Sequence, residues 1–328
     1  MCEGVGHVRL ADFLRLLRAG RLAKLKAAMK ASAILLLAVG ARASNVKVST
    51  YEALEGAVLA GEHKILVESD ITFAAPIEIP AGKNIRIYAK DERKTLDGNG
   101  ETQLFRVDGT LTLQNLVLAE GYATNGFCSY TQNSGEACGG GAVHVDVDAH
   151  LIVDGCAFRD SQARYGGAIY TYGGAVDVSD STFTENGAYE AGGAVWTYAH
   201  VALSISNCEF TGNVAIKAGA VFTGGDTTIA DSTFTGNVAT ASEPSDDDHA
   251  GGFWGGEGGA IWVNEDTVRV DRCAFEGNRA RTEGAAIYVR NLGEAVVAAT
   301  TFAGNQADCD GVVTTGRYSC VEGLDDVH

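Results

Sequence analysis

The chain has 328 residues, of which 46 % are hydrophobic and 20 % charged, and its 42 glycines far outnumber its 3 prolines. This apolar content excludes a disordered chain, and the glycines lack the three-residue period of collagen. The formal net charge of −17 argues against nucleic acid and anionic membrane surfaces as partners. No apolar run reaches the roughly 20 residues of a spanning helix, so we expect no transmembrane segment in the mature chain.

Residues 1–43 have the layout of a secretory signal peptide. A basic start at Lys30 precedes an apolar stretch over 31–40, and small residues stand at Ala41 and Ala43. Cleavage after Ala43 predicts a protein that is secreted or held at the cell surface. The alternative is an amphipathic surface helix that continues into a short buried one.

Residues 44–63 predict a short N-terminal cap. Ser49 and Glu52 have the spacing of a capping box, and Gly61 follows as a stop signal. The expected apolar face consists of Ala53, Leu54, Ala57 and Val58. A helix with this face would cover a β structure whose first edge would otherwise be unpaired.

Residues 64–139 predict short, irregular β segments. Alternating runs such as ITF, IEI and NIRIYA are separated by the turn sequences PAGK and DGNG. A polar stretch at 123–138 predicts a loop at the end of this region.

From residue 140 to 308 the sequence repeats itself six times. The spacing between copies is 26 residues except for one interval of 40, which holds an insertion at about 242–257. The copies of GGA[IV], or a close variant, begin at Gly140, Gly166, Gly192, Ala218, Gly258 and Gly284. Each copy then has a phenylalanine, at Phe158, Phe183, Phe210, Phe234, Phe275 and Phe302. Three residues later stand Ser161, Asn186, Asn213, Asn237, Asn278 and Asn305.

A unit of this length with short β-branched runs and no helical period predicts a stacked β architecture. Three strands and three turns would make one coil of a right-handed parallel β-helix, an all-β single-stranded solenoid. Equivalent residues would then stack about 4.8 Å apart from coil to coil. We therefore expect an internal phenylalanine stack and a ladder of asparagine amides. Residues 309–328 would form a C-terminal cap or tail.

The combination of GGA[IV] with an F-x-x-N turn resembles the repeat of the chlamydial polymorphic outer membrane proteins and of similar exported β-helix proteins. The resemblance covers about residues 140–307. It implies a right-handed β-helix that is secreted or displayed at a surface and used for adhesion.

The seven cysteines that follow residue 43 divide into two groups. Cys128 with Cys138, and Cys309 with Cys320, bracket polar loops and predict two local disulfides. The other group, Cys156, Cys208 and Cys273, lies two residues before the phenylalanine column. Neighbours in that group would be two coils, about 9.6 Å, apart, which is too far for a disulfide. We expect them to be buried free thiols.

The residue after each GGA[IV] forms the candidate ligand-binding column. Its members are His144, Tyr170, Trp196, Phe222, Trp262 and Tyr288, and two residues later stand Tyr172 and Tyr198. If the column faces outward, its rings suit an extracellular glycan or a surface protein. If it faces inward, the rings are core. The insertion adds Trp254 as a further candidate contact, and its carboxylates Asp246, Asp247 and Asp248 could hold Ca²⁺, although such runs are usually solvated loop tips.

A catalytic function is the second hypothesis for this chain. The polar candidates Asp146, Asp148, His144 and Arg290 lie in or beside the same columns, and a polysaccharide lyase or epimerase would need such groups on one outer face. No local pairing of these residues favours that chemistry, and no cofactor other than Ca²⁺ is indicated. A third hypothesis is a structural envelope component with no discrete site. The sequence favours non-catalytic binding of a glycan or protein.

Overall fold

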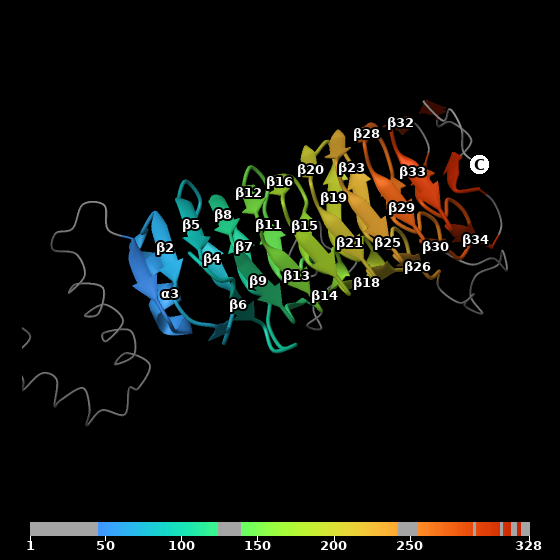
Figure 1. The fold of residues 1–328 in the computed structure, drawn as a ribbon. Helices are drawn as coiled ribbons and strands as arrows, with labels where there is room; N and C mark the ends of the chain where they lie inside the picture. Colours follow the sequence, from blue (N-terminus) through green and yellow to red (C-terminus); the bar gives the residue numbers. More distant parts are fainter. Residues whose placement is uncertain are drawn as a thin grey trace, which may run out of the picture. The chain divides into compact units, whose positions relative to one another are not determined.

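The computed structural model describes residues 45–123, 139–241, 255–290, 293–308, 311–315 and 320–322. The predicted signal peptide, the loop at 123–138 beyond Ala123, and the centre of the insertion lie outside these ranges. Within residues 46–328, which form one compact unit, the described chain coils into a parallel β-helix (Figure 1). All strand pairs among the described residues are parallel, and apart from local register shifts after Ala163 and after Trp196 they make equivalent residues of successive coils direct neighbours.

Four sheets run along the described solenoid, and each coil between residues 105 and 307 contributes one strand to each of them. We number the sheets in the order in which a coil visits them. Sheet 1 has nine strands and begins each coil with the GGA[IV] segment. Its strands are β4 (Ile77–Ile79), β7 (Phe105–Val107), β11 (Val143–Val145), β15 (Ile169–Thr171), β19 (Val195–Ala199), β23 (Val221–Gly224), β27 (Ile261–Val263), β31 (Ile287–Val289) and β35 (Val313–Thr315).

Sheet 2 follows and has eleven strands in the described chain. They are β1 (Val46–Val48), β2 (Lys64–Val67), β5 (Asn84–Tyr88), β8 (Thr110–Gln114), β12 (His150–Asp154), β16 (Ala175–Ser179), β20 (Leu203–Ser206), β24 (Thr227–Ala230), β28 (Thr267–Asp271), β32 (Glu294–Ala298) and β36 (Cys320–Glu322).

Sheet 3 carries the phenylalanine column on nine described strands. They are β3 (Ile71–Thr72), β6 (Lys94–Asp97), β9 (Leu116–Ala119), β13 (Ala157–Arg159), β17 (Thr182–Thr184), β21 (Glu209–Thr211), β25 (Thr233–Thr235), β29 (Ala274–Glu276) and β33 (Thr301–Ala303).

Sheet 4 corrects the prediction of three strands per coil. Its seven described strands are β10 (Tyr122–Ala123), β14 (Gln162–Tyr165), β18 (Gly187–Ala191), β22 (Val214–Ala215), β26 (Val238–Ala239), β30 (Arg279–Ala280) and β34 (Gln306–Ala307). Most have only two residues, which is too short to show an alternating pattern in the sequence. An asparagine directly precedes the five later strands, β18 to β34, and Ser161 precedes β14.

The capping helix is α3 (Tyr51–Ala60), confirmed with a shift of one residue at its start. Thr50, not Ser49, is the N-cap, and its hydroxyl accepts a hydrogen bond from the backbone N–H of Ala53 at 3.3 Å. Gly61 ends the helix with φ of +75°, a left-handed conformation that glycine adopts without strain. Leu54, Ala57 and Val58 are buried as expected, whereas Ala53 is exposed.

The core is a stack of phenylalanine rings. The first five members are fully buried and Phe302 is partly buried at the C-terminal end. Consecutive ring centroids are 4.7–5.1 Å apart, and the ring planes lie within 14° of parallel. Each ring packs against the equivalent ring of the next coil. The packing of the core therefore requires the phenylalanine to recur at the repeat period.

The asparagine ladder closes the turn after each phenylalanine. Asn213 is typical: its side-chain oxygen accepts from the backbone N–H and the amide of Asn186, both at 3.0 Å. Its own amide donates to the carbonyl of Phe183 and to the side chain of Asn237, both at 2.9 Å. Every polar atom of this buried amide therefore has a partner, which the interior requires.

The three predicted free thiols are confirmed. Cys156, Cys208 and Cys273 are buried and form no disulfide. Burial raises the pKa of Cys156 to about 12 and that of Cys208 to about 11. The backbone N–H of Cys208 donates to the hydroxyl of Ser232 at 3.1 Å, so thiols and small hydroxyl side chains alternate along one column.

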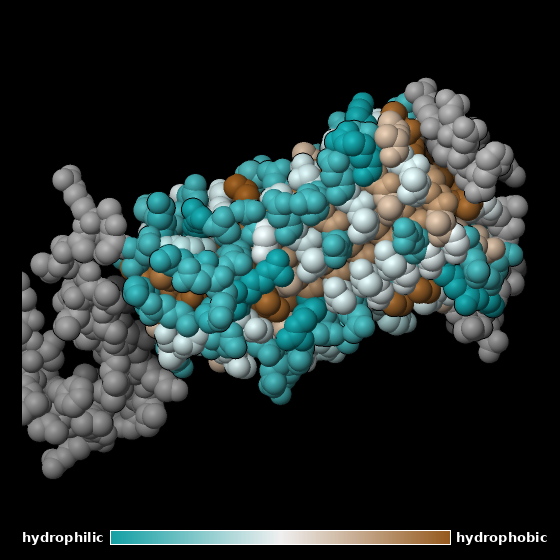
Figure 2. Space-filling view, viewed as in Figure 1, coloured by the Kyte–Doolittle hydropathy of each residue, from teal (hydrophilic) through white to brown (hydrophobic). Residues whose placement is uncertain are grey.

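Surface character changes along the solenoid. On the face shown in Figure 2, hydrophilic side chains predominate over the N-terminal coils, and paler or more hydrophobic residues are prominent over the central and C-terminal coils. No described helix has the length and apolar character needed to cross a membrane.

Candidate binding face on sheet 1

The candidate column lies on the outer face of sheet 1. In β11, Val143 and Val145 point into the core, and His144 between them points to the opposite face. The same alternation repeats in the later strands, and strand pairing keeps the column in register from His144 to Tyr288. The column is therefore not part of the main core. Tyr170, Trp196 and Phe222 form a separate cluster, in which they pack with Tyr165 and Ala191.

The rings of this column stack face to face along the solenoid axis. Successive centroids are 4.5–5.9 Å apart. His144 and Trp262 are only 2 % exposed, and Tyr170 and Trp196 8 %. The expectation of a row of open ring faces therefore needs correction, because each face is covered by the neighbouring ring. Of the six rings, only those of Phe222 and Tyr288 are partly exposed.

Cover for the column comes from the residue that precedes each GGA[IV] segment. A side chain added at Gly139 would collide with the ring of Tyr170. Tyr165 packs against Trp196 with ring centroids 5.4 Å apart, and Lys217 lies 6.0 Å from the ring centre of Trp262. In each case the covering residue directly precedes a GGA[IV]-type segment, and the ring that it covers lies in the coil after the one that this segment begins. The sequence reasoning missed Tyr165, although an aromatic residue at this position was the signal that could have found it.

Six aromatic residues make one contiguous surface, which we call the aromatic patch. Its members are Tyr165, Tyr170, Tyr172, Trp196, Tyr198 and Phe222. Trp196 is its centre and contacts four of the others, with ring centroids 4.8–5.7 Å away. The patch spans parts of β14, β15, β19 and β23.

Tyr172 and Tyr198 are the accessible part of the patch. They are 42 % and 43 % exposed, and their rings stack with centroids 4.4 Å apart. In the adjacent coils the corresponding residues are Asp146 and Gly224, neither of which has a ring. The proximity of Tyr172 raises the pKa of Tyr198 above its ordinary value. The pair thus offers hydroxyl groups and ring surface together.

A buried ion pair fixes the other side of the patch. Glu190 accepts hydrogen bonds from the hydroxyl of Tyr165 and from Nε of Arg164, both at 2.5 Å. The guanidinium of Arg164 also lies 5.5 Å from the ring centre of Tyr165. Because Glu190 is buried, this network orients Tyr165 against Trp196 in the absence of any ligand.

A charged cluster surrounds Trp262 at the C-terminal side of the patch. Lys217 and Arg290 approach the ring of Trp262, with Arg290 at 5.7 Å from its centre. Burial lowers the pKa of Lys217 and raises that of Glu257. The indole Nε1 of Trp262 and the Oε2 of Glu257 are both buried without a hydrogen-bond partner among the described residues.

The structure does not bring the catalytic candidates together. His144 is buried, its Nδ1 lies 3.3 Å from the carbonyl of Gly139, and burial lowers its pKa, which leaves the ring neutral at physiological pH. Asp146 and Asp148 are exposed in the turn after β11. Arg290 follows β31, which is the fifth strand from β11 along sheet 1. The set therefore cannot act on one bond.

Several predicted sites lie outside the described residues. These are Trp254, the carboxylates Asp246–Asp248, Cys128, Cys138 and Cys309. Cys320 lies in β36, but its side chain is not described. The structure therefore does not test the two predicted disulfides, Cys128–Cys138 and Cys309–Cys320. Within the described ranges, no group of three or more His, Cys, Asp or Glu residues is arranged to hold a metal ion.

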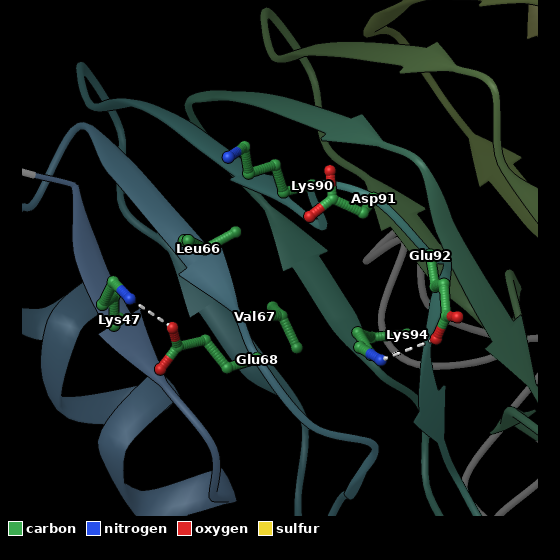
Figure 3. Close-up of a pocket in the computed structure, with 8 residues that line it drawn as sticks. All are labelled: Lys47, Leu66, Val67, Glu68, Lys90, Asp91, Glu92 and Lys94. Atoms are coloured by element: carbon green, nitrogen blue, oxygen red, sulfur yellow. Dashed lines mark hydrogen bonds and ion pairs between the residues drawn. The ribbon is translucent and has the colours of Figure 1, made fainter.

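A shallow pocket of about 550 Å³ lies near the N-terminal end (Figure 3). Its charged lining residues are Lys47, Glu68, Lys90, Asp91, Glu92 and Lys94. Lys47 pairs with Glu68 at 2.5 Å and Lys94 with Glu92 at 3.7 Å. Three lysines are thus balanced by three carboxylates, and no aromatic ring lines the pocket. The pocket therefore has neither a net charge nor a stacking surface with which to select a ligand, unlike the aromatic patch.

Comparison with known proteins agrees with the fold. The family model described as right-handed beta helix region matches residues 114–267. A search of curated proteins found nothing that matches this chain. The fold is a right-handed parallel β-helix, a fold that suggests a surface or extracellular protein, or one with a polysaccharide-related role. The match is to β-helices in general, so the chlamydial repeat remains a resemblance.

Proposed function

We propose that this protein is an exported, non-catalytic β-helix that binds an extracellular glycan through the aromatic patch on sheet 1. The single observation that carries the proposal is the patch itself: six rings in mutual contact on the outer face of the solenoid, with Tyr172 and Tyr198 open to solvent. Export rests on the signal-peptide layout of residues 1–43.

The outer position of the patch supports binding rather than folding as its purpose. The solenoid already has a complete core without these rings, because Val, Ile and Phe side chains fill the interior of the same coils. Aromatic side chains gathered at a surface and rimmed by polar groups are typical of recognition sites. The ion pair of Arg164 and Glu190 holds part of the patch in place, which reduces the ordering cost of binding.

A sugar suits the chemistry of this surface. Its apolar C–H face can lie against Tyr172 or Tyr198 at the ends of the tyrosine pair, while its hydroxyls bond to the phenol groups. Each such contact is worth only about 1 kcal/mol, so useful affinity requires a polymer that touches several coils at once. The repeat of about 4.8 Å between coils provides such an extended surface.

The test compares two variants on a glycan array. Tyr172→Ser combined with Tyr198→Ser should abolish binding and leave the β-sheet circular dichroism unchanged, since both side chains are largely exposed. Tyr189→Ser is the matched control, because Tyr189 is 72 % exposed on β18 and lies outside the patch. Equal binding by the double variant and the control would overturn the proposal. Cleavage of any polymer by the unmodified chain would favour the lyase or epimerase hypothesis instead.

A further inference from the structure

The surroundings of Trp262 differ from those of the aromatic patch. Its ring continues the outer column, with the Phe222 centroid at 4.5 Å and that of Tyr288 at 5.9 Å. Two cations approach this one ring, Lys217 from the segment before a GGA[IV]-like motif and Arg290 from the turn after β31. None of the rings at the N-terminal end of the patch has two cationic side chains beside it among the described residues.

The indole N–H of Trp262 is an unused donor in this setting. The side chain is 2 % exposed, and Nε1 has no hydrogen-bond partner among the described residues. Buried indole N–H groups usually have an acceptor. Arg290 is exposed and Lys217 only partly buried, and both are long, flexible side chains that can move aside. A group that entered between them would meet three donors and two positive charges.

Glu257 is the acidic residue beside Lys217 and Arg290. It interacts electrostatically with both Lys217 and Arg290, and Lys217 also interacts with Glu190. The Oε2 of Glu257 is a buried acceptor without a partner. An incoming group that carries a negative charge next to a hydroxyl would therefore satisfy both the indole N–H and Glu257.

We propose that Lys217, Arg290 and the indole N–H of Trp262 form an anion subsite for a carboxylate or sulfate of the bound glycan. The subsite rests on the proposed function, because it extends the aromatic patch by one coil through the contact of Phe222 with Trp262. It makes the protein selective for acidic over neutral polymers despite the overall negative charge of the chain. Short-range hydrogen bonds to charged groups decide this selectivity, because long-range repulsion is screened at physiological ionic strength.

Two pairs of polymers test the subsite with the full chain. Pectin of low and of high methyl ester content differs in free carboxylates, and chondroitin with and without sulfate differs in sulfate groups. The unmodified chain should bind the more acidic member of at least one pair about ten- to a hundredfold more tightly, the range expected for charge-assisted hydrogen bonds. The pair that shows the preference identifies the anion.

The variants separate the subsite from the patch. Lys217→Met combined with Arg290→Gln should abolish the preference but keep binding of the neutral member. Trp262→Phe keeps the ring stack and removes only the N–H, and it should reduce the preference severalfold. Lys83→Met combined with Arg269→Gln removes two exposed cations elsewhere and should change nothing. Tyr172→Ser with Tyr198→Ser should abolish binding of both members of a pair.

The failures are distinguishable. Equal binding of both members by the unmodified chain, or a preference that survives Lys217→Met with Arg290→Gln, would overturn the subsite and leave the glycan-binding function standing. Absence of binding to every polymer, here and on the array, would overturn the proposed function and the subsite with it.

Discussion

Two columns of aromatic rings run along this solenoid, one inside it and one on the outer face of sheet 1. In both, the rings stack on their equivalents in the next coil, at 4.7–5.1 Å inside and 4.5–5.9 Å outside. Parallel in-register pairing imposes this stacking on any repeated side chain, whichever face it occupies. Ring stacking by itself therefore does not distinguish core from surface.

The composition of the columns does distinguish them. Within the six repeats every member of the inner column is phenylalanine, and Leu118 and Leu96 continue the same column towards the N-terminus, both fully buried. The outer column contains histidine, tyrosine, tryptophan and phenylalanine. The inner column is therefore apolar throughout, and only the outer column combines ring surface with the polar groups that recognition can use.

The strongest test of this comparison is truncation within the inner column. Phe210→Ala should lower the free energy of unfolding by about 3–5 kcal/mol, because it leaves a cavity between two stacked rings in a rigid interior. Chemical denaturation followed by circular dichroism measures the change. A near-neutral result would mean that the inner rings are not what holds the coils together.

Loss of the ladder amide should come next. Asn213→Ala removes four hydrogen bonds and leaves buried groups of Asn186, Asn237 and Phe183 unsatisfied, at a cost of about 2–3 kcal/mol. Asn264→Ala, on the outer face of sheet 1, is the control and should be close to neutral. Similar losses in both variants would show that the ladder has no special role.

The buried thiols predict a loss of stability in alkali. A thiol whose pKa is raised from 9.0 to about 12 in the folded chain stabilises the fold below pH 9, and this contribution is lost as pH rises from 9 towards 12. For Cys156 the loss between pH 8 and pH 10 should be about 1 kcal/mol. Cys156→Ser should abolish this part of the pH dependence, and serine fits because Ser181 and Ser232 occupy the same column. An unchanged slope in the variant would contradict thiol burial.

The smallest effect is expected on the outer face. Tyr198→Ala should change the free energy of unfolding by less than about 1 kcal/mol, since the ring is almost half exposed and exposed substitutions are usually mild. Thermal denaturation beside Phe210→Ala makes the comparison direct. If Tyr198→Ala were as damaging as the core variant, the outer column would be structural and the binding proposal would lose its basis.

Much of the fold follows from the repeat alone. The six copies predicted the parallel solenoid, the stack around Phe210, the amide ladder around Asn213 and the free thiols, because identical residues at a constant period must stack on one another. The match of Ser49 and Glu52 to a capping box placed the helix correctly and missed its N-cap by one residue. Thr50 has the extended backbone that an N-cap needs, and adjacent Ser and Thr residues cannot be distinguished by spacing.

The candidate site was predictable only in part. The spacing identified the outer column, but the exposure of its rings also depends on residues that lie more than one period before them in the sequence, such as Gly139 beneath Tyr170 or Lys217 beside Trp262. The cluster of Lys217, Glu257 and Arg290 around one indole joins residues from three coils that share no motif.

The sequence by itself determined the period, the fold class and the residues that form columns, because in a solenoid each of these is set by the repeat length. Only the tertiary structure decided that the coils between residues 105 and 307 have four strands each, that most outer rings are buried while Tyr172 and Tyr198 stay open, and that the indole N–H of Trp262 lacks a partner among the described residues. These properties depend on contacts between neighbouring coils and on how side chains fill the space there, and no one-dimensional period specifies them.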